Sequence, residues 1–375
     1  PTEPNLVFLG TEFGLYVSFD KAKNWNKWEH GYPKAVSTYD MTIQEREADL
    51  VIGTFGRAIY VLDDIRPLRA FAKNAGKAPI GKITAFPAPD AYQAEIQQPH
   101  GERFMASAKY AGENRAFGGR LSYLIQDEKE KLDSLIVKIY TASGEQIRTL
   151  KSLPTKGVNR ILWNLDRKST AEMTGGWGGG GQGGGQGGGG RSRGFFEPSG
   201  GDAIPGTYKV VMEYGGESSE TSITVNADPR IKPVLTDLQA KDNFLKKVEA
   251  ISSEVTATTK KLDEAQKAID KVNSLIKDVK TDDAKALETA AKDIKKKLDT
   301  AREAFTGPKV EGQGIVRNLF PTTMSRMFDP RSYANSSYTA PGATEERLLA
   351  HAKESVAEAI AKVEAFIKGD WKAFE

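Results

Sequence analysis

The sequence predicts a chain that is mainly β-structure with an all-α C-terminal region. Up to about residue 227, short segments recur in which apolar and polar residues alternate, and this period of two is typical of strands. From about residue 234 the apolar residues recur at spacings of three and four, which indicates helices. The length of 375 residues is enough for two or three domains of ordinary size.

The first region, residues 1–66, contains an Asp-box. Residues 18–25 match the pattern Ser-x-Asp-x-Gly-x-Ser/Thr/Asn-Trp, with Ala22 in the glycine position. A short carboxylate such as Asp20 can accept hydrogen bonds from the N–H groups of its own turn, and an indole such as Trp25 can cover the apolar side of a hairpin. We therefore interpret Ser18, Asp20 and Trp25 as structural residues of a hairpin in one blade of a β-propeller.

A second copy of this hairpin follows in the sequence. Residues 9–17 align with residues 52–61 if one insertion is allowed, and Gly53 follows Gly10 by 43 residues. Propeller blades repeat every 40 to 50 residues or so, with four short strands each. Residues 1–66 are therefore predicted to be the last, incomplete blades of a propeller. Because exposed strand edges are normally paired or covered, we expect an N-terminal segment, missing here or retained as a cleaved companion, to complete them.

Residues 82–227 are predicted to form a β-sandwich, after a Lys-rich linker at residues 67–81. Pro67 cannot continue a central strand, so it ends the preceding region. Glycines at Gly144 and Gly215 provide the positive φ angles that tight hairpins need. Six alternating runs predict strands, and no helical period interrupts them: 120–126, 135–141, 146–151, 159–166, 207–214 and 220–226.

A glycine-rich loop, residues 175–194, lies within the predicted sandwich. A segment this rich in glycine buries too little apolar surface to compensate for the conformational entropy that is lost on ordering, so we expect a flexible loop between two strands. One interpretation is a glycine-arginine arm that binds a ligand or nucleic acid. With only Arg191 and Arg193 present, a permissive loop expansion is favoured. No Gly-Lys-Ser/Thr closes the segment, so a phosphate-binding loop is not predicted.

Residues 234–375 are predicted to form an antiparallel bundle of three amphipathic helices with a long connection at 307–343. Thr281 provides an N-cap for the second helix, and Gly307-Pro308 ends it. The first helix, of about 44 residues, is roughly twice as long as either partner. Its excess length would be covered by the aromatic-rich connection, by the sandwich or by another molecule. We expect the connection to pack back along the long helix; the alternative is that it binds a partner.

Composition and charge predict neither nucleic-acid binding nor a membrane span. The chain has 53 basic and 50 acidic residues, a net charge of +3, and no apolar run near 18 residues. It has no cysteine, which fits an exported bacterial protein that avoids stray thiols, but many cytosolic proteins also lack cysteine. Its three histidines lie in three different regions without ligand spacing, so no metal or cofactor site is predicted. No catalytic residue is predicted either.

One acidic pair, Asp63-Asp64, has two interpretations. The pair could hold a cation or act as paired carboxylates. The favoured interpretation is a polar strand end in which the carboxylates are salt-bridged to Arg57, Arg66 or Arg69. The many Lys and Glu residues of 240–300 are interpreted as the solvated faces of helices.

These motifs together resemble the C-terminal part of large bacterial sortilin-type propeller proteins with bacterial-neuraminidase repeats, often labelled glycosyl hydrolases. The matching residues are the Asp-box, Gly53-Thr54-Phe55-Gly56-Arg57 and Val61-Leu62-Asp63-Asp64-Ile65-Arg66-Pro67-Leu68. The family usually has His where this chain has Phe55, so any role of that His is lost. The sandwich is similar to the immunoglobulin-like domain of flagellar hook-capping proteins, on residues 137–144, 157–165 and 205–208.

The resemblance implies an extracytoplasmic protein whose activity is left open. The favoured function is non-catalytic binding or scaffolding in the bacterial cell envelope or exterior, with a protein or glycan as ligand. The alternative is a sialidase-like glycoside hydrolase whose catalytic blades lie upstream of this chain. Its mechanism would need an arginine cluster, a Tyr/Glu nucleophile pair and an acidic proton donor from several blades, and a propeller fold by itself does not decide between the two.

Overall fold

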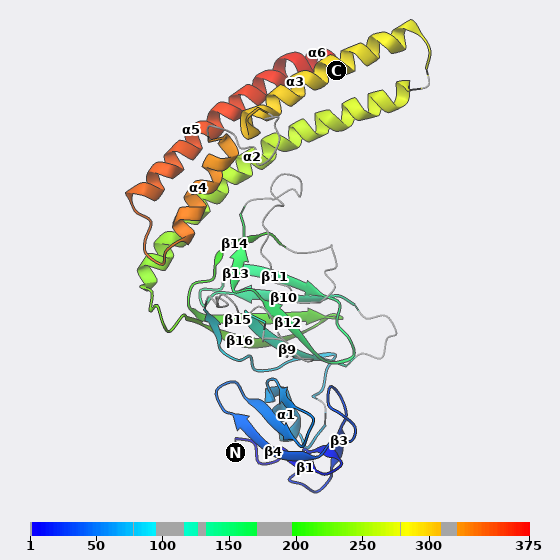
Figure 1. Ribbon diagram of the computed structural model, residues 1–375, viewed down its shortest axis with the longest axis vertical. Coiled ribbons are helices and arrows are strands. Elements are labelled where there is room, and N and C mark those ends of the chain that lie inside the picture. Colours follow the sequence, from blue (N-terminus) through cyan, green and yellow to red (C-terminus); the bar gives the residue numbers. More distant parts are fainter. Residues whose placement is uncertain are drawn as a thin grey trace. The chain divides into compact units, whose positions relative to one another are not determined.

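The computed structural model describes residues 2–77, 79–94, 116–126, 133–170, 197–277, 279–308 and 321–375. It shows β-sheets followed by a helical C-terminal region, which confirms the coarse prediction (Figure 1). Helix outweighs strand over the described part, so the term mainly β applies only to the residues before the helices. The described residues form two compact units. The first holds those up to Asp166 with Glu197 and Pro205–Lys232, and the second holds 167–170, Pro198–Ile204 and those from Pro233 onward.

The first unit begins with two three-stranded antiparallel sheets. The first sheet has the order β1-β2-β3 (Val7–Thr11, Gly14–Ser18, Asn26–Trp28), and the second has the order β4-β5-β6 (Thr38–Gln44, Asp49–Thr54, Ile59–Leu62). Leu15 of the first sheet and Leu50 and Ile52 of the second belong to one buried apolar cluster. Each such side chain stabilises the fold by about 1.5–3 kcal/mol when it is fully buried. The two sheets therefore pack face to face through this cluster.

The hairpin repeat seen in the sequence is also a structural repeat. Gly10 lies opposite Leu15 across β1 and β2, and Gly53 lies opposite Ile59 across β5 and β6. The glycines nevertheless have different surroundings. A Cβ added at Gly10 would lie 2.8 Å from the carbonyl oxygen of Thr38, whereas a Cβ at Gly53 would first meet the carbonyl oxygen of Asp40, in its own sheet, at 3.5 Å. Only Gly10 is therefore required by the close approach of another strand.

Part of the predicted linker is helical. Helix α1 (Arg66–Lys73) begins with Pro67 in its first turn, where the fixed φ of proline favours a helix start. Phe71 of this helix contacts Phe19 of the Asp-box turn and Phe86 beyond the linker, with ring centroids 6.5 and 5.8 Å apart. These ring contacts give the segment 66–73 a packed position that its composition does not reveal.

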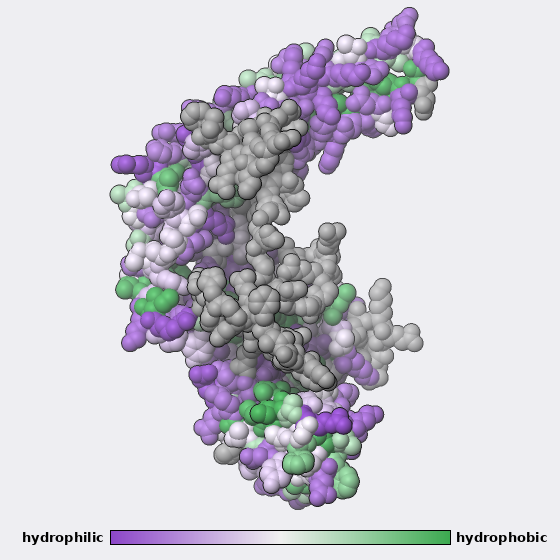
Figure 2. All heavy atoms as spheres, viewed as in Figure 1, coloured by the Kyte–Doolittle hydropathy of each residue, from purple (hydrophilic) through white to green (hydrophobic). Residues whose placement is uncertain are grey.

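In Figure 2, apolar side chains also remain at the surface of the residues that Figure 1 draws in blue.

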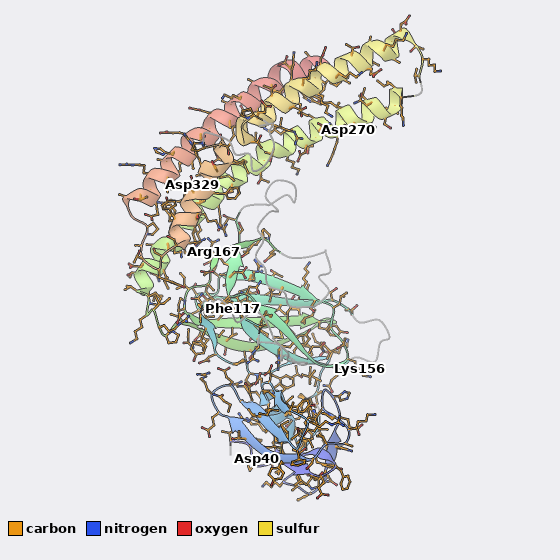
Figure 3. All side chains as sticks on the ribbon, in the orientation of Figure 1. Asp40, Phe117, Lys156, Arg167, Asp270 and Asp329 are labelled. Atoms are coloured by element: carbon orange, nitrogen blue, oxygen red, sulfur yellow. The ribbon has the colours of Figure 1, made fainter. Side chains whose placement is uncertain are left out.

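The remainder of the first unit consists of two facing sheets. Gly119 shows their close approach, because a Cβ there would lie 2.7 Å from Ile223 of the opposite sheet. Trp163 and Tyr208 meet edge to face in the core, with centroids 5.2 Å apart. Lys156, labelled in Figure 3, lies between β11 and β12. The strand orders are β11-β10-β15-β16-β8 (Gln146–Ser152, Leu135–Tyr140, Gly206–Tyr214, Glu217–Ala227, Ala91–Gln93) and β12-β9-β7 (Gly157–Trp163, Gly119–Ile125, Ile83–Ala85).

The second unit is built on helices α2 (Leu235–Ile276), α3 (Asp282–Thr306), α4 (Thr323–Asn335) and α5 (Ala343–Phe366). A single-turn π-helix (Ile367–Trp371) and the short α6 (Lys372–Phe374) end the chain. One apolar cluster joins all four long helices. The predicted N-cap of the second helix is confirmed, because the Thr281 hydroxyl accepts a hydrogen bond from the Ala284 N–H at 3.2 Å.

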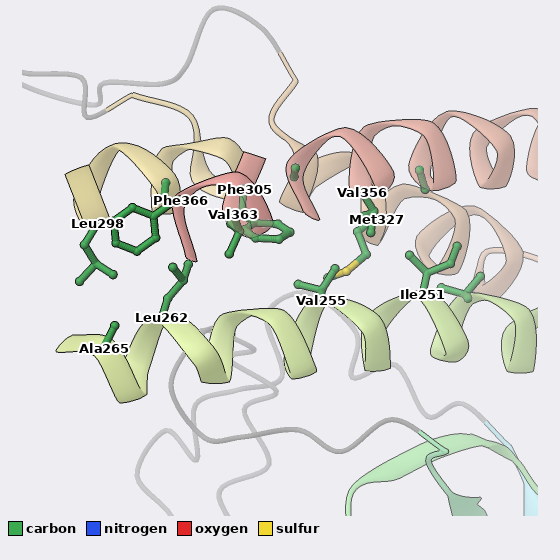
Figure 4. Packing of buried hydrophobic residues seen from close by; sticks show 14 of the residues in the cluster. Ile251, Val255, Leu262, Ala265, Leu298, Phe305, Met327, Val356, Val363 and Phe366 are labelled. Atoms are coloured by element: carbon green, nitrogen blue, oxygen red, sulfur yellow. The ribbon is translucent and has the colours of Figure 1, made fainter. Parts of the chain in front are cut away.

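Helix α4 lies within the predicted connection 307–343, so the described residues of the bundle form four helices of 13 residues or more instead of the predicted three. Its start is capped by Thr322, whose hydroxyl accepts from the Ser325 N–H at 3.2 Å. Figure 4 shows Met327 of α4 beside Val356 of α5 and Val255 of α2. Helix α2 has 42 residues and is about 63 Å long, and both α3 and α4 pack on it. The fourth helix therefore covers the excess length of α2.

Two short strands, β13 (Asp166–Lys168) and β14 (Ser199–Asp202), pair with each other. They flank the predicted glycine-rich loop 175–194, which lies outside the described residues.

Candidate functional site

The Asp-box residues form a hydrogen-bonded turn. The Ser18 hydroxyl donates to Asp20 Oδ1 at 2.8 Å and accepts from the Ala22 N–H at 2.9 Å. Asn24 donates to Asp20 twice, from its backbone N–H at 2.9 Å and from its side-chain amide at 2.6 Å. These bonds, above all the one from the Asn24 side chain, lower the pKa of Asp20 to about 2. The Asp20 carboxylate therefore stabilises the turn in which it lies.

Trp28, and not the Asp-box residue Trp25, packs its indole against the apolar cluster between the first two sheets. Trp25 remains 37% exposed, whereas Trp28 of β3 packs against the cluster between the two sheets. Trp28 also donates from Nε1 to the carbonyl oxygen of His30 at 2.9 Å. The role of Trp25 in covering the hairpin therefore stays a prediction, and Trp28 is the residue that the pattern of the Asp-box does not reveal.

The Asp63-Asp64 pair lies in a network of hydrogen bonds and ion pairs. Asp64 is buried, accepts from Arg66 at 2.8 Å and donates its backbone N–H to Asp49 at 2.9 Å. The carbonyl oxygen of Asp63 accepts from Arg160 at 3.3 Å. The Asp63 carboxylate lies 4.0 Å from the guanidinium of Arg120 on β9. The predicted salt bridge to Arg66 is confirmed, and arginines far away in the sequence complete the network.

A buried charged cluster in the helical unit corrects one sequence interpretation. Glu249 on α2 is only 2% exposed, although the sequence predicts that the Lys and Glu residues of 240–300 lie on solvated helix faces. Both of its carboxylate oxygens accept from the guanidinium of Arg167, at 2.9 and 3.0 Å. Arg167 (Figure 3) also donates from Nε to Asp242 at 2.6 Å. Thr170 adds two hydrogen bonds to Glu249, from its backbone N–H and its hydroxyl, at 3.0 and 2.9 Å.

The electrostatics of this cluster follow from burial and pairing. Burial alone would raise the pKa of Glu249, but the hydrogen bonds from Arg167 and Thr170 outweigh it and lower that pKa. Burial likewise opposes the charge of Arg167, while Glu249 and Asp242 raise the pKa of its guanidinium overall. Both groups are therefore charged near neutral pH. The cluster attaches residues 167–170 to helix α2, and Arg331 of α4 holds β14 through the carbonyl oxygen of Gly200 at 3.2 Å.

Among the described residues, one face of the second sheet exposes apolar side chains and is a candidate binding surface. Ile59 and Val61 on β6 are 71% and 56% exposed. Their partners on the same face are Val51 and Gly53 of β5, with Asp40 of β4 opposite Gly53 (Figure 3). We call these five residues the open face. Contiguous exposed apolar residues with a polar rim are typical of interaction surfaces.

Two aromatic side chains lie near one end of the open face. Tyr39 occupies a register irregularity of β4, and Phe55 follows β5. Tyr39 is 82% and Phe55 77% exposed. The Phe55 N–H donates to the carbonyl oxygen of Ser37 at 3.0 Å, which joins the two segments. Aromatic side chains of this kind add large apolar contact areas at binding surfaces.

Other candidate chemistry is not assembled in the described residues. His30 follows β3 and His351 lies on α5, both exposed, while His100 is outside the described part. Within the residues that the structure describes, no three His, Asp or Glu side chains are grouped as a metal ion would need. Nor does that part of the chain contain a helix that is long and apolar enough to span a membrane.

Comparisons of the chain with family models, curated proteins and solved structures gave no match. The resemblance to sortilin-type propeller proteins therefore stays a prediction that rests on the motifs quoted above.

Proposed function

We propose that the chain is the C-terminal part of an exported bacterial propeller protein that acts by non-catalytic binding or scaffolding in the cell envelope or exterior. The observation that carries this proposal is the repeated hairpin. Two consecutive sheets have equivalent hairpin registers and bury Leu15, Leu50 and Ile52 between them. Repeats that bury their faces only against the neighbouring repeat are typical of propellers and related arrays.

The finer architecture follows the same proposal. The first two sheets would be terminal propeller blades, and the facing sheets of residues 82–227 would form an immunoglobulin-like sandwich. The core contact between Trp163 and Tyr208, and a strand β15 that starts directly after Pro205, support the sandwich.

The hydrogen bonds of Asp20, Asp49 and Asp64 give these carboxylates structural roles rather than the roles of a glycosidase pair. Glycosidases use two carboxyl groups that flank the scissile bond and exchange protons with substrate or water. Asp20, Asp49 and Asp64 instead accept hydrogen bonds from groups of their own fold. Their positions are explained by the turns and strand ends that they hold.

The second candidate is a sialidase-like glycoside hydrolase with its catalytic blades outside these residues. The observation in its favour is the Asp-box hairpin, on which the resemblance to bacterial-neuraminidase repeats rests.

Two parallel assays distinguish the candidates. The protein encoded by the complete reading frame that contains this chain is tested for turnover of sialosides and aryl glycosides, and for saturable binding to peptide and glycan arrays. We expect binding without turnover. Turnover that is abolished by mutating a carboxylate at the centre of the blades would show that the protein is a hydrolase.

A further inference from the structure

The two sheets at the start of the chain can be compared residue by residue. In the first hairpin Phe8 lies opposite Val17, and in the second Val51 lies opposite Val61. The Gly10–Leu15 and Gly53–Ile59 pairs are equivalent in the same way. Because alternate residues of a strand share a face, equivalent faces can be assigned on both sheets. One carries Phe8, Gly10, Leu15 and Val17; the other carries Val51, Gly53, Ile59 and Val61.

These equivalent faces differ in what covers them. On the first sheet Leu15 is 1% and Val17 2% exposed, and Leu15 packs into the cluster shared with the second sheet. On the second sheet the equivalent Ile59 and Val61 are largely exposed. The first sheet thus has a neighbour that the second sheet lacks among the described residues.

The opposite faces show the converse difference. Leu9 of the first sheet is 43% exposed, whereas the equivalent Ile52 of the second sheet is buried against the first. Each sheet therefore exposes the face that is equivalent to the one buried on the other sheet. The exposed face with Ile59 and Val61 corresponds to the buried face with Leu15, and the exposed face with Leu9 corresponds to the buried face with Ile52. An interface in which two different faces meet can be repeated, and it closes into a ring when the rotation permits.

We infer that the open face of the second sheet binds a further β-sheet of the same repeat, carried by another part of the same polypeptide. This inference rests on the proposed propeller architecture and names the partner of its last sheet. The bound sheet would contact the open face through the same kinds of residue that the second sheet uses to contact the first. It would place a small residue such as Thr38 over Gly53, and an apolar row like Leu50 and Ile52 over Ile59 and Val61.

The strands at the sheet edges favour this partner over a second copy of the chain. The second sheet has a strand before its hairpin, β4, and the described part of the first sheet has no equivalent. Conversely, the first sheet has a strand after its hairpin, β3, which the described second sheet lacks. A second copy would have the same two open edges, whereas different repeats of one polypeptide can supply both strands. Unpaired strand edges are normally covered in this way.

Thiol labelling tests the inference directly, because the chain has no cysteine of its own. Ile59→Cys is introduced into the 375-residue chain and into the protein encoded by the complete reading frame. We expect a maleimide to label the chain rapidly and the complete protein at least about tenfold more slowly, because the thiol is buried there. Leu153→Cys is the matched control, since Leu153 directly follows β11, is 73% exposed and should be labelled rapidly in both proteins.

A pair of glycine variants gives an independent readout. Gly10→Ala should lower the Tm of both proteins, because its new Cβ collides with Thr38. Gly53→Ala should leave the Tm of the 375-residue chain unchanged within about 1 °C, because its Cβ meets Asp40 only at ordinary contact distance. In the complete protein Gly53→Ala should lower the Tm by a few degrees, because the bound sheet closes over this position.

Two results would overturn the inference. The first is equally rapid labelling of Cys at position 59 in both proteins. The second is protection in the 375-residue chain alone that increases with its concentration, which would identify a second copy as the partner. Neither readout depends on a ligand or on turnover. If the labelling results contradict the interface, the proposed binding function is not affected. If the peptide and glycan arrays give no ligand, the proposed interface is not affected.

Discussion

The buried pair of Arg167 and Glu249 makes the sharpest prediction about stability. In Glu249→Ala, the guanidinium of Arg167 loses two hydrogen bonds and Thr170 loses the partner of its N–H and hydroxyl. Removing one partner of a buried ion pair usually costs about 3–5 kcal/mol. Because Asp242 still pairs with Arg167 at 2.6 Å, we expect the lower end, about 3 kcal/mol.

Urea unfolding followed by far-UV circular dichroism measures this loss in the helical unit. Glu254→Ala is the matched control, because Glu254 lies on the same helix but is exposed, and it should change the free energy of unfolding by less than about 0.5 kcal/mol. The double variant Arg167→Met/Glu249→Leu should recover only part of the loss, since apolar replacement of a buried pair is often neutral, but here it also removes the partner of Asp242 and the acceptor of Thr170. A loss below about 1 kcal/mol for Glu249→Ala, or no recovery in the double variant, would refute the reasoning.

Glu249, Asp20 and Met327 each allow a further test. The folded-state pKa of Glu249 lies below its unfolded value of about 4.3. The stabilisation that its carboxylate adds is therefore complete above about pH 4.3 and is lost as the pH falls through the folded-state pKa. In Glu249→Gln, the free energy of unfolding should consequently fall less steeply as the pH is lowered. Asp20→Ala removes the acceptor of the Asn24 N–H, so hydrogen exchange at that amide should accelerate, and an unchanged rate would contradict the role assigned to the Asp-box. Met327→Ala should cost about 2–5 kcal/mol in urea unfolding, against less than about 0.5 kcal/mol for the exposed Phe328→Ala; equal costs would mean that α4 does not pack as described.

Local patterns in the sequence were sufficient for the regular elements. The six alternating runs of residues 120–226 all form strands, because each buries one face and a period of two reports that directly. The helical period from residue 238 onward and the cap at Thr281 locate α2 and α3 for the same reason. The turn of the Asp-box was also predictable, because its bonds join residues two to four positions apart.

Helix α4 and the charged clusters could not be predicted in this way. Helix α4 is only 13 residues long and contains Pro330, so its apolar period is short and interrupted. Glu249 looks like any other acidic residue on a long polar helix. Its partner Arg167 is 82 residues away in the sequence, and only the tertiary fold, in which β14 beside β13 packs on α2, brings the two together. Arg120 and Arg160 reach the Asp63-Asp64 strand end in the same non-local manner.

The sequence by itself determined the order of β-structure and helix, the repeated hairpin and the residues of its turn, because these depend on periodicity and on contacts between near neighbours. Only the tertiary structure decided which copy of the repeat is covered. Leu15 and Ile59 occupy equivalent positions, yet one is buried and the other open. Burial depends on the neighbouring sheet, and the identity of that neighbour is not encoded in the hairpin itself.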